Sequence, residues 1–133
     1  MAASFPAECR HVLETLGEVY NNDALAREQG IDAALVEHKL DALVAPSGGP
    51  AGLTDPVNGD SRGPVSGPSN LAAVAGYPHI TVPMGYVHGL PVGISFFGIA
   101  FSEPKLISLA YAFEQLTKFR RPPRFLPTAD LTS

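Results

Sequence analysis

Apolar and polar residues alternate most clearly over residues 76–98, where two short apolar runs flank a turn-like segment. The runs His79–Met84 and Val92–Gly98 each carry apolar residues at every second position. This spacing places those side chains on one face of a β-strand. The segment Gly85–Pro91 between them is rich in residues that favour a chain reversal. We therefore predict a β-hairpin with a loop of about four to six residues.

A third apolar run, Leu40–Ala45, ends at Pro46. Its length and flanking residues favour a buried strand that is parallel to its neighbours or central in a sheet. We expect it to join the hairpin, in an orientation that the sequence leaves open. The expected fold is α/β, with a partial sheet of about three strands covered by helices, and the family resemblance described below implies that this sheet is mixed. The expected strands are 41–45, 79–84 and 91–97.

Apolar residues at helical spacing predict several helices around these strands. Asn21–Asp23 should break the first helix, with Asp23 capping the second, and Gly30 should end or offset the second. Ser69 or Asn70 should cap a short helix that ends at Gly76. The expected helices are 6–20, 23–29, 31–38, 71–75 and 103–119.

The last of these helices has the broadest apolar stripe. Ser102 is its expected N-cap, and Pro122 and Pro123 follow its end. Such a stripe is typical of a helix that packs on a core. Its residues are Leu106, Leu109, Ala110, Phe113, Leu116 and Phe119.

Residues 46–70 differ in kind, because Gly and Pro dominate them, with Ser, Asn and Asp between. Such a segment buries too little apolar surface to hold regular structure. A connection of this length inside a compact domain is usually functional or mobile.

Charge and composition exclude several classes of function. The 133 residues form one domain and carry a net charge of −4, without the basic stripe that binds nucleic acid. No apolar run is long enough to cross a membrane. The N-terminus lacks the pattern of a signal peptide, and Cys9 is the one cysteine. We therefore expect a cytoplasmic protein with no membrane or nucleic-acid partner.

No familiar catalytic or metal-binding motif is present. The four histidines, at 11, 38, 79 and 88, lack the spacing of a zinc site. The glycines at 47–52 are not followed by the Lys and Ser or Thr of a P-loop. Ser66 and Ser69 have no His or Lys beside them in sequence to act as a base. The residues therefore predict no catalytic set and no metal or cofactor.

Five segments in a fixed order resemble the C-terminal portion of the amidase signature family, most closely its peptide-amidase-like and acetamidase-like members. The resemblance covers about residues 23–127, which leaves 1–22 as an N-terminal helical extension and 128–133 as a tail. The segments are LDALVAP (40–46), SGGPA (47–51), NLAAVAGYPHITVPMG (70–85), HGLPVGISFFG (88–98) and FSEPKLISLAYAFEQ (101–115).

The resemblance implies hydrolysis of a carboxamide to a carboxylate and ammonia or an amine. Family members use a Ser–cis-Ser–Lys triad, and this chain has no Gly-Gly-Ser-Ser-Gly-Gly run. Its lysines, Lys39, Lys105 and Lys118, match non-catalytic helices of the family. No catalytic residue carries over, so we expect the chain to be inactive alone, because a serine without a base is a weak nucleophile.

The resemblance also suggests which residues face the substrate funnel of a complete amidase. These are Ser47, Gly48, Gly49 and Pro50, which follow the 41–45 strand. The alternative is that Gly48 and Gly49 only turn the chain away from the strand.

Three hypotheses about partners follow. The chain is a truncated amidase whose N-terminal portion is missing, or one chain of a split amidase, and it meets a small amide substrate only in the complete enzyme. The third is a non-catalytic binding or structural module that self-associates as a homo-oligomer, because cutting a large sheet exposes strand edges and an apolar face.

Overall fold

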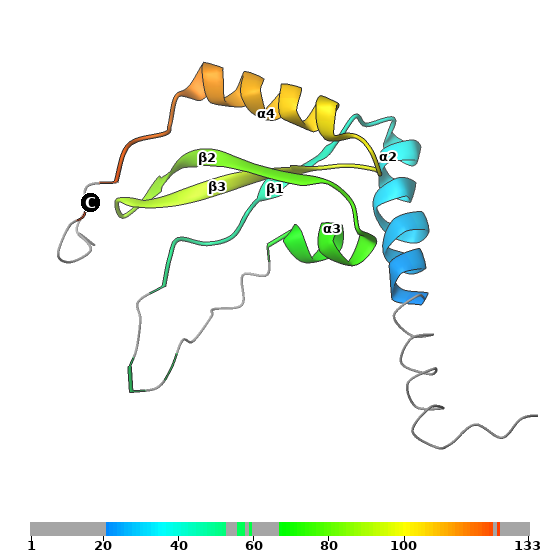
Figure 1. The fold of residues 1–133 in the computed structure, drawn as a ribbon, viewed down its shortest axis with the longest axis horizontal. Helices are drawn as coiled ribbons and strands as arrows, with labels where there is room; N and C mark the ends of the chain where they lie inside the picture. The colour runs from blue at the N-terminus through cyan, green and yellow to red at the C-terminus, as the bar shows by residue number, and fades with distance from the viewer. Residues whose placement is uncertain (1–20, 53–55, 58, 60–66, 124, 126–133) are drawn as a thin grey trace, which may run out of the picture.

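The computed structural model describes residues 21–52, 56–57, 59, 67–123 and 125. The expected helix 6–20 and the tail 128–133 lie outside these residues. In this part of the chain, the helical residues 21–26 are followed by three strands and four further helical segments (Figure 1). The strands are β1 (Leu43–Pro46), β2 (His79–Val87) and β3 (Leu90–Phe97), and the helices are η1 (Arg27–Ile31), α2 (Asp32–His38), α3 (Ser69–Ala75) and α4 (Glu103–Thr117).

The three strands form one sheet in the order β1-β3-β2, which confirms the α/β class and the hairpin. Phe97 lies opposite both Leu43 of β1 and His79 of β2. All pairs among the described strands are antiparallel, so the mixed pairing expected from the resemblance does not occur among them. The prediction that β1 is parallel or central is wrong, because β3 holds the centre. β1 is an edge strand that is buried on one face only, since Leu43 and Ala45 pack against the buried cluster that contains Phe97 while Val44 is 52% exposed.

The hairpin turn is tighter than predicted. β2 continues past the expected end to Val87, and β3 begins at Leu90, so only two residues connect the strands. These residues, His88 and Gly89, both have positive φ, 49° and 73°, as the favoured two-residue turns require. An irregularity between Pro83 and Gly85 shifts the register and lets the longer strands pair.

The helical region before β1 is continuous where a break was expected. Residues 21–26 are already helical, so Asn21–Asp23 do not interrupt the helix and Asp23 does not cap a new one. The π-helical turn η1 contains Gly30 and leads directly into α2. The expected offset at Gly30 is therefore confirmed, in the form of a wider helical turn.

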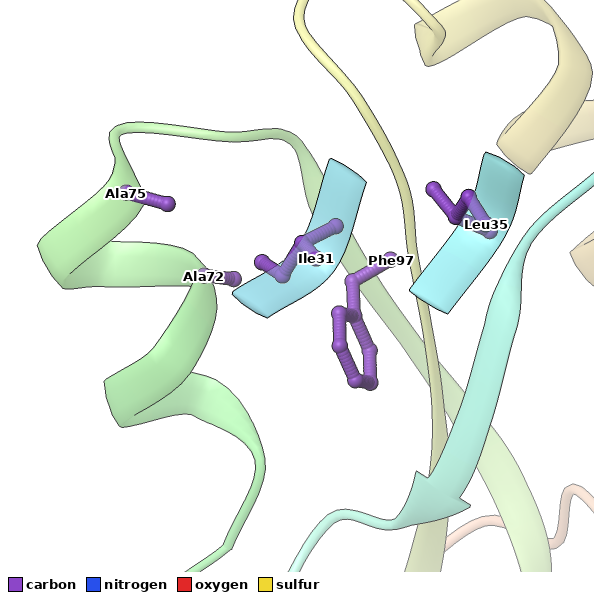
Figure 2. Close-up of a cluster of buried hydrophobic side chains, with 5 residues drawn as sticks. All are labelled: Ile31, Leu35, Ala72, Ala75 and Phe97. Atoms are coloured by element: carbon purple, nitrogen blue, oxygen red, sulfur yellow. The ribbon is translucent and has the colours of Figure 1, made fainter. Parts of the chain in front are cut away.

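Two neighbouring phenylalanines of β3 anchor two separate cores. Phe97 packs with residues of η1, α2 and α3 on one face (Figure 2), whereas Phe96 packs under α4 on the other. Successive side chains of a strand point to opposite faces, which explains this division. The α3-side cluster consists of Ile31, Leu35, Ala72, Ala75 and Phe97, and the α4-side cluster consists of Phe96, Leu106 and Ala110.

The first and last residues of α3 and α4 differ in part from the sequence predictions. Gly76 takes the left-handed conformation at the end of α3, as expected, but Pro68 rather than Ser69 or Asn70 occupies the N-cap. Ser102 is the N-cap of α4, although its hydroxyl donates to the Ile99 carbonyl instead of capping the helix. α4 ends at Thr117, short of Phe119.

The apolar stripe of α4 is buried only in part. Leu106 and Ala110 are each 1% exposed, and Phe113 stacks edge-on against Phe96. Leu116 is 86% exposed, so its predicted place in the core is wrong. None of the described helices is long and apolar enough to cross a membrane.

A polar cluster joins η1 and α2 to the end of α3. The Tyr77 hydroxyl donates to Asp32 Oδ2 at 2.8 Å, and Arg27 donates from Nε to the Ala75 carbonyl. The Arg27 guanidinium also lies 5.8 Å from the centre of the Tyr77 ring. Burial raises the pKa of Tyr77, as do the hydrogen bond to Asp32 and its negative charge, while the charge of Arg27 opposes this effect.

Truncation of Leu106 should test the α4-side cluster. We expect Leu106→Ala to lower the free energy of unfolding by about 2–5 kcal/mol, because the removed atoms leave a cavity. The control is Leu116→Ala on the same helix. Because this side chain is exposed, its removal should change the free energy of unfolding by less than about 0.5 kcal/mol. Urea denaturation followed by circular dichroism measures both. Equal losses for the two variants would contradict the assignment of faces.

The Tyr77 hydroxyl should make stability depend on pH in the alkaline range. The folded chain keeps this proton above the ordinary pKa of 10.0, so it binds more protons than the unfolded chain there. The contribution is therefore complete below about pH 10 and is lost as pH rises through the folded-state pKa. Tyr77→Phe should cost about 1–2 kcal/mol at pH 7 and should flatten the decline in stability above pH 10.

Urea unfolding between pH 7 and pH 11 measures this dependence. Tyr111→Phe, which removes the hydroxyl of a side chain that is 62% exposed, serves as the control. An unchanged alkaline decline in Tyr77→Phe would show that Tyr77 does not cause it.

Candidate functional site

The face of the sheet that carries the α3-side cluster changes character along β3. Phe97 is buried in that cluster, Ser95 follows on the same face, and Gly93 comes next. The neighbouring strands follow the same course, since Ala45 and Thr81 lie opposite Ser95. Helices α2 and α3 therefore cover an apolar end of this face, and a row of hydroxyl and small residues lies beside it.

Three hydroxyl groups from three chain segments meet in this row. The Ser47 and Ser95 oxygens are 2.7 Å apart, and Thr81 Oγ1 lies 3.1 Å from Ser95 Oγ. Ser47 Oγ donates to Thr81 Oγ1 at 3.3 Å, which closes the triangle. We call Ser47, Thr81 and Ser95 the hydroxyl ring. Ser95 is fully buried, whereas Thr81 is exposed.

The sheet fixes Ser47 although that residue lies beyond the end of β1. Its N–H donates to the Gly93 carbonyl at 2.8 Å, which continues the ladder between β1 and β3 by one residue. Main chain and side chain of Ser47 are therefore both held by β3. This double attachment orients the start of the long Gly- and Pro-rich segment.

Two glycines make this arrangement sterically possible. A Cβ at Gly93 would lie 2.7 Å from the Thr81 methyl carbon and 2.9 Å from Ser47 Oγ. A Cβ at Gly67 would lie 2.0 Å from the Ser47 carbonyl oxygen. The backbone at Gly67 thus touches Ser47, so the two ends of the 47–67 connection meet beside the hydroxyl ring.

The structure distributes the four predicted substrate-facing residues around this point. Ser47 is half-buried and belongs to the hydroxyl ring, and Gly48 is half-buried beside it. Gly49 and Pro50 are exposed. An added Cβ at Gly48 would meet no atom within 4 Å, so crowding does not explain that glycine.

Sequence reasoning missed Thr81, Ser95, Gly93 and Gly67. Thr81 and Ser95 carry a signal in the sequence, because each is a polar residue within an otherwise apolar strand. The alternation of side chains along each strand assigns each of them to a face of its own strand, but only the register of the pairing shows that they lie opposite each other. No local pattern brings Ser47 to them across more than 30 residues.

Other polar groups on the described part of the chain do not extend this site into a metal or base centre. His79 is on the same strand face as Thr81, but its Nε2 is buried without a hydrogen-bond partner and its ring lies against Phe97. Among the described residues, no group of three His, Cys, Asp or Glu side chains is placed to hold a metal ion.

Gly93→Ala should disturb the hydroxyl ring through its new Cβ. We expect a loss of about 1–3 kcal/mol in the free energy of unfolding, because Thr81 and Ser47 must move to make room. Gly48→Ala is the matched control, since open space surrounds that position, and it should stay within about 0.5 kcal/mol. Thermal and urea unfolding measure the difference, and equal stabilities of the two variants would contradict this packing.

Comparisons with known proteins connect this geometry to a family. No protein-family model matches the chain. A probable amidase of Arabidopsis thaliana is 44% identical over 98 residues, which are 73% of this chain and 16% of the relative. The peptide amidase from Stenotrophomonas maltophilia is 51% identical, with a TM-score of 0.70 over 83% of this chain and 21% of that structure.

An amidase family protein from Bacillus anthracis is 33% identical, with a TM-score of 0.57 over 93% of this chain and 20% of that structure. The chain thus spans about a fifth or less of the length of these relatives. The two solved structures resemble the chain in both sequence and fold. The chain is therefore homologous to enzymes of the amidase signature family and corresponds to a C-terminal portion of such an enzyme.

Proposed function

We propose that this chain contributes the C-terminal portion of an amidase, a hydrolase that converts a carboxamide to a carboxylate and ammonia or an amine. The observation that carries the proposal is the match to the peptide amidase, at 51% identity and a TM-score of 0.70 over 83% of the chain. In this role the chain supplies a sheet and its covering helices, and the reacting groups come from elsewhere.

The hydroxyl ring supports this division of labour. Within the described residues, the side chains of Ser47 and Ser95 hydrogen-bond to hydroxyl groups and to no other group. Activation of a serine requires a neighbouring base, and the ring contains none. The ring therefore suits binding and orientation, and the nucleophile and base belong to another part of the enzyme.

We propose that Ser47, Gly48, Gly49 and Pro50 line the substrate path in the assembled enzyme. Ser47 is held by β3 through its N–H and its hydroxyl, which gives the following residues a fixed starting point. Gly49 and Pro50 are exposed in the described structure, so they are available to a substrate or to the rest of an amidase. The lone cysteine suits the reducing cytoplasm, where we propose that the chain acts.

Self-association is the second candidate function, and exposed apolar side chains favour it. Leu71 and Val74 of α3 are 58% and 44% exposed, and Val36 of α2 is 76% exposed. β1 and β2 are both edge strands of the described sheet. Such edges and apolar groups call for a cover, which a second copy provides in a homo-oligomer and the rest of an amidase provides in a complete enzyme.

A complementation experiment should test the amidase role. The purified chain is mixed with the Stenotrophomonas maltophilia peptide amidase from which the matching segment has been deleted, and ammonia release from a peptide amide is followed. We expect no release above a heat-denatured control from either part alone, and release from the mixture that rises with added chain until it saturates.

Light scattering on the same samples separates the alternatives. A mixed complex that hydrolyses the amide supports the proposal. Hydrolysis by the chain alone would contradict it, because an active site would then lie within these residues. A stable homodimer that neither binds the truncated amidase nor restores hydrolysis would support the self-associating module instead.

A further inference from the structure

We infer that the hydroxyl ring is a hydrogen-bond acceptor site for the N–H of a carboxamide, and that Thr81 makes the contact. This inference rests on the proposed amidase role, because it assigns part of the substrate contact to this chain. Two of the three members of the ring, Thr81 of β2 and Ser95 of β3, lie outside the predicted segment Ser47–Pro50. The basis of the inference is the direction of the three hydrogen bonds within the ring.

Each hydroxyl of the ring has one proton to donate and two lone pairs that accept. Ser47 donates to Thr81, so the remaining two contacts of the triangle must be made by the protons of Thr81 and Ser95. Ser95 is 0% exposed, and no water can take its proton. The arrangement that satisfies it runs from Ser47 to Thr81, from Thr81 to Ser95, and from Ser95 back to Ser47.

In this cycle every proton points into the ring. Each oxygen donates once and accepts once within it, which leaves one lone pair that is directed outward. Thr81 is the exposed member, so a ligand meets an oxygen that accepts but has no proton to give. Hydrogen bonds that form such a closed chain also polarise one another, which strengthens the outward acceptor.

This property favours ligands that donate a hydrogen bond over ligands that only accept one. A carboxamide presents N–H groups and can donate to Thr81 Oγ1. A carboxylate has only acceptor oxygens at neutral pH, and it would face a lone pair instead of a proton. The ring thus favours the amide substrate of a hydrolase over the carboxylate product of the same reaction.

The surroundings keep the acceptor accessible. Gly93 lies beneath Ser47 and Thr81, and any side chain there would push into the ring from below. The segment that begins at Ser47 continues through exposed residues, Gly49 and Pro50. Helices α2 and α3 cover only the neighbouring row of the face, around Phe97.

The test is an NMR titration of the full chain with three small probes that share the butyryl group. Butyramide carries N–H groups, N,N-dimethylbutyramide keeps the carbonyl without any N–H, and butyrate is the carboxylate. We expect butyramide to shift the backbone amide signals of Thr81, Ser95 and Ser47 in a saturable manner. The two other probes should bind at least about fivefold more weakly, the ratio that one net hydrogen bond provides.

Variants of Thr81 connect the binding to its hydroxyl. Thr81→Val keeps the shape and should lose the preference for butyramide, whereas Thr81→Ser should retain it. Thr117→Val is the matched control, because it removes a hydroxyl of α4 that donates to the Phe113 carbonyl outside the ring, and it should leave the titration unchanged. Dispersed amide spectra establish that each variant is folded.

Equal affinity of the native chain for butyramide and N,N-dimethylbutyramide would overturn the inference without any substitution. Absence of saturable shifts at the three residues, or an unchanged preference in folded Thr81→Val, would overturn it as well. The titration needs no catalysis and no second polypeptide. A failed complementation experiment with a positive titration would therefore contradict the amidase role and leave the acceptor site standing.

Discussion

The fold depends on the burial of two adjacent aromatic side chains on opposite faces of one strand. Phe96 and Phe97 are 7% and 4% exposed, and each anchors a separate apolar cluster. A shift of β3 by one residue would exchange the two faces and bury Ser95 beneath α4. The register of the sheet, and with it the position of every polar group on the strand, is fixed by this pair.

The candidate site is a consequence of the same register. Ser95 lies one step beyond Phe97 on the face that α2 and α3 cover only in part, so its hydroxyl lies where the apolar packing ends. Thr81 comes opposite because His79 lies opposite Phe97, and Ser47 comes opposite because β1 pairs with the other side of β3. Burial of Ser95 is tolerated because both neighbours supply hydrogen bonds.

Period-two alternation was sufficient to predict the two strands of the hairpin, and the length and flanking residues of a continuous apolar run were sufficient to predict β1. Strand order was not predictable from β1, since its apolar run reflects the packing of Leu43 and Ala45 on one face of the sheet and not a central position. The predicted break at Asn21–Asp23 is wrong because polar residues are tolerated on an exposed helical face. In the site, Ser47 was predicted from the resemblance, whereas Thr81 and Ser95 required the pairing of distant strands.

Gly67 lies against Ser47, so the geometry of the sheet does not depend on the length of the chain between these two residues. Because the two ends of this connection touch, the sheet, α3 and the hydroxyl ring place no demand on how many residues lie between. The entropy of closing such a loop rises only slowly with its length. Insertions and deletions within the connection therefore change the entropy of loop closure only slightly, so related chains can differ in its length without moving the strands that carry the ring.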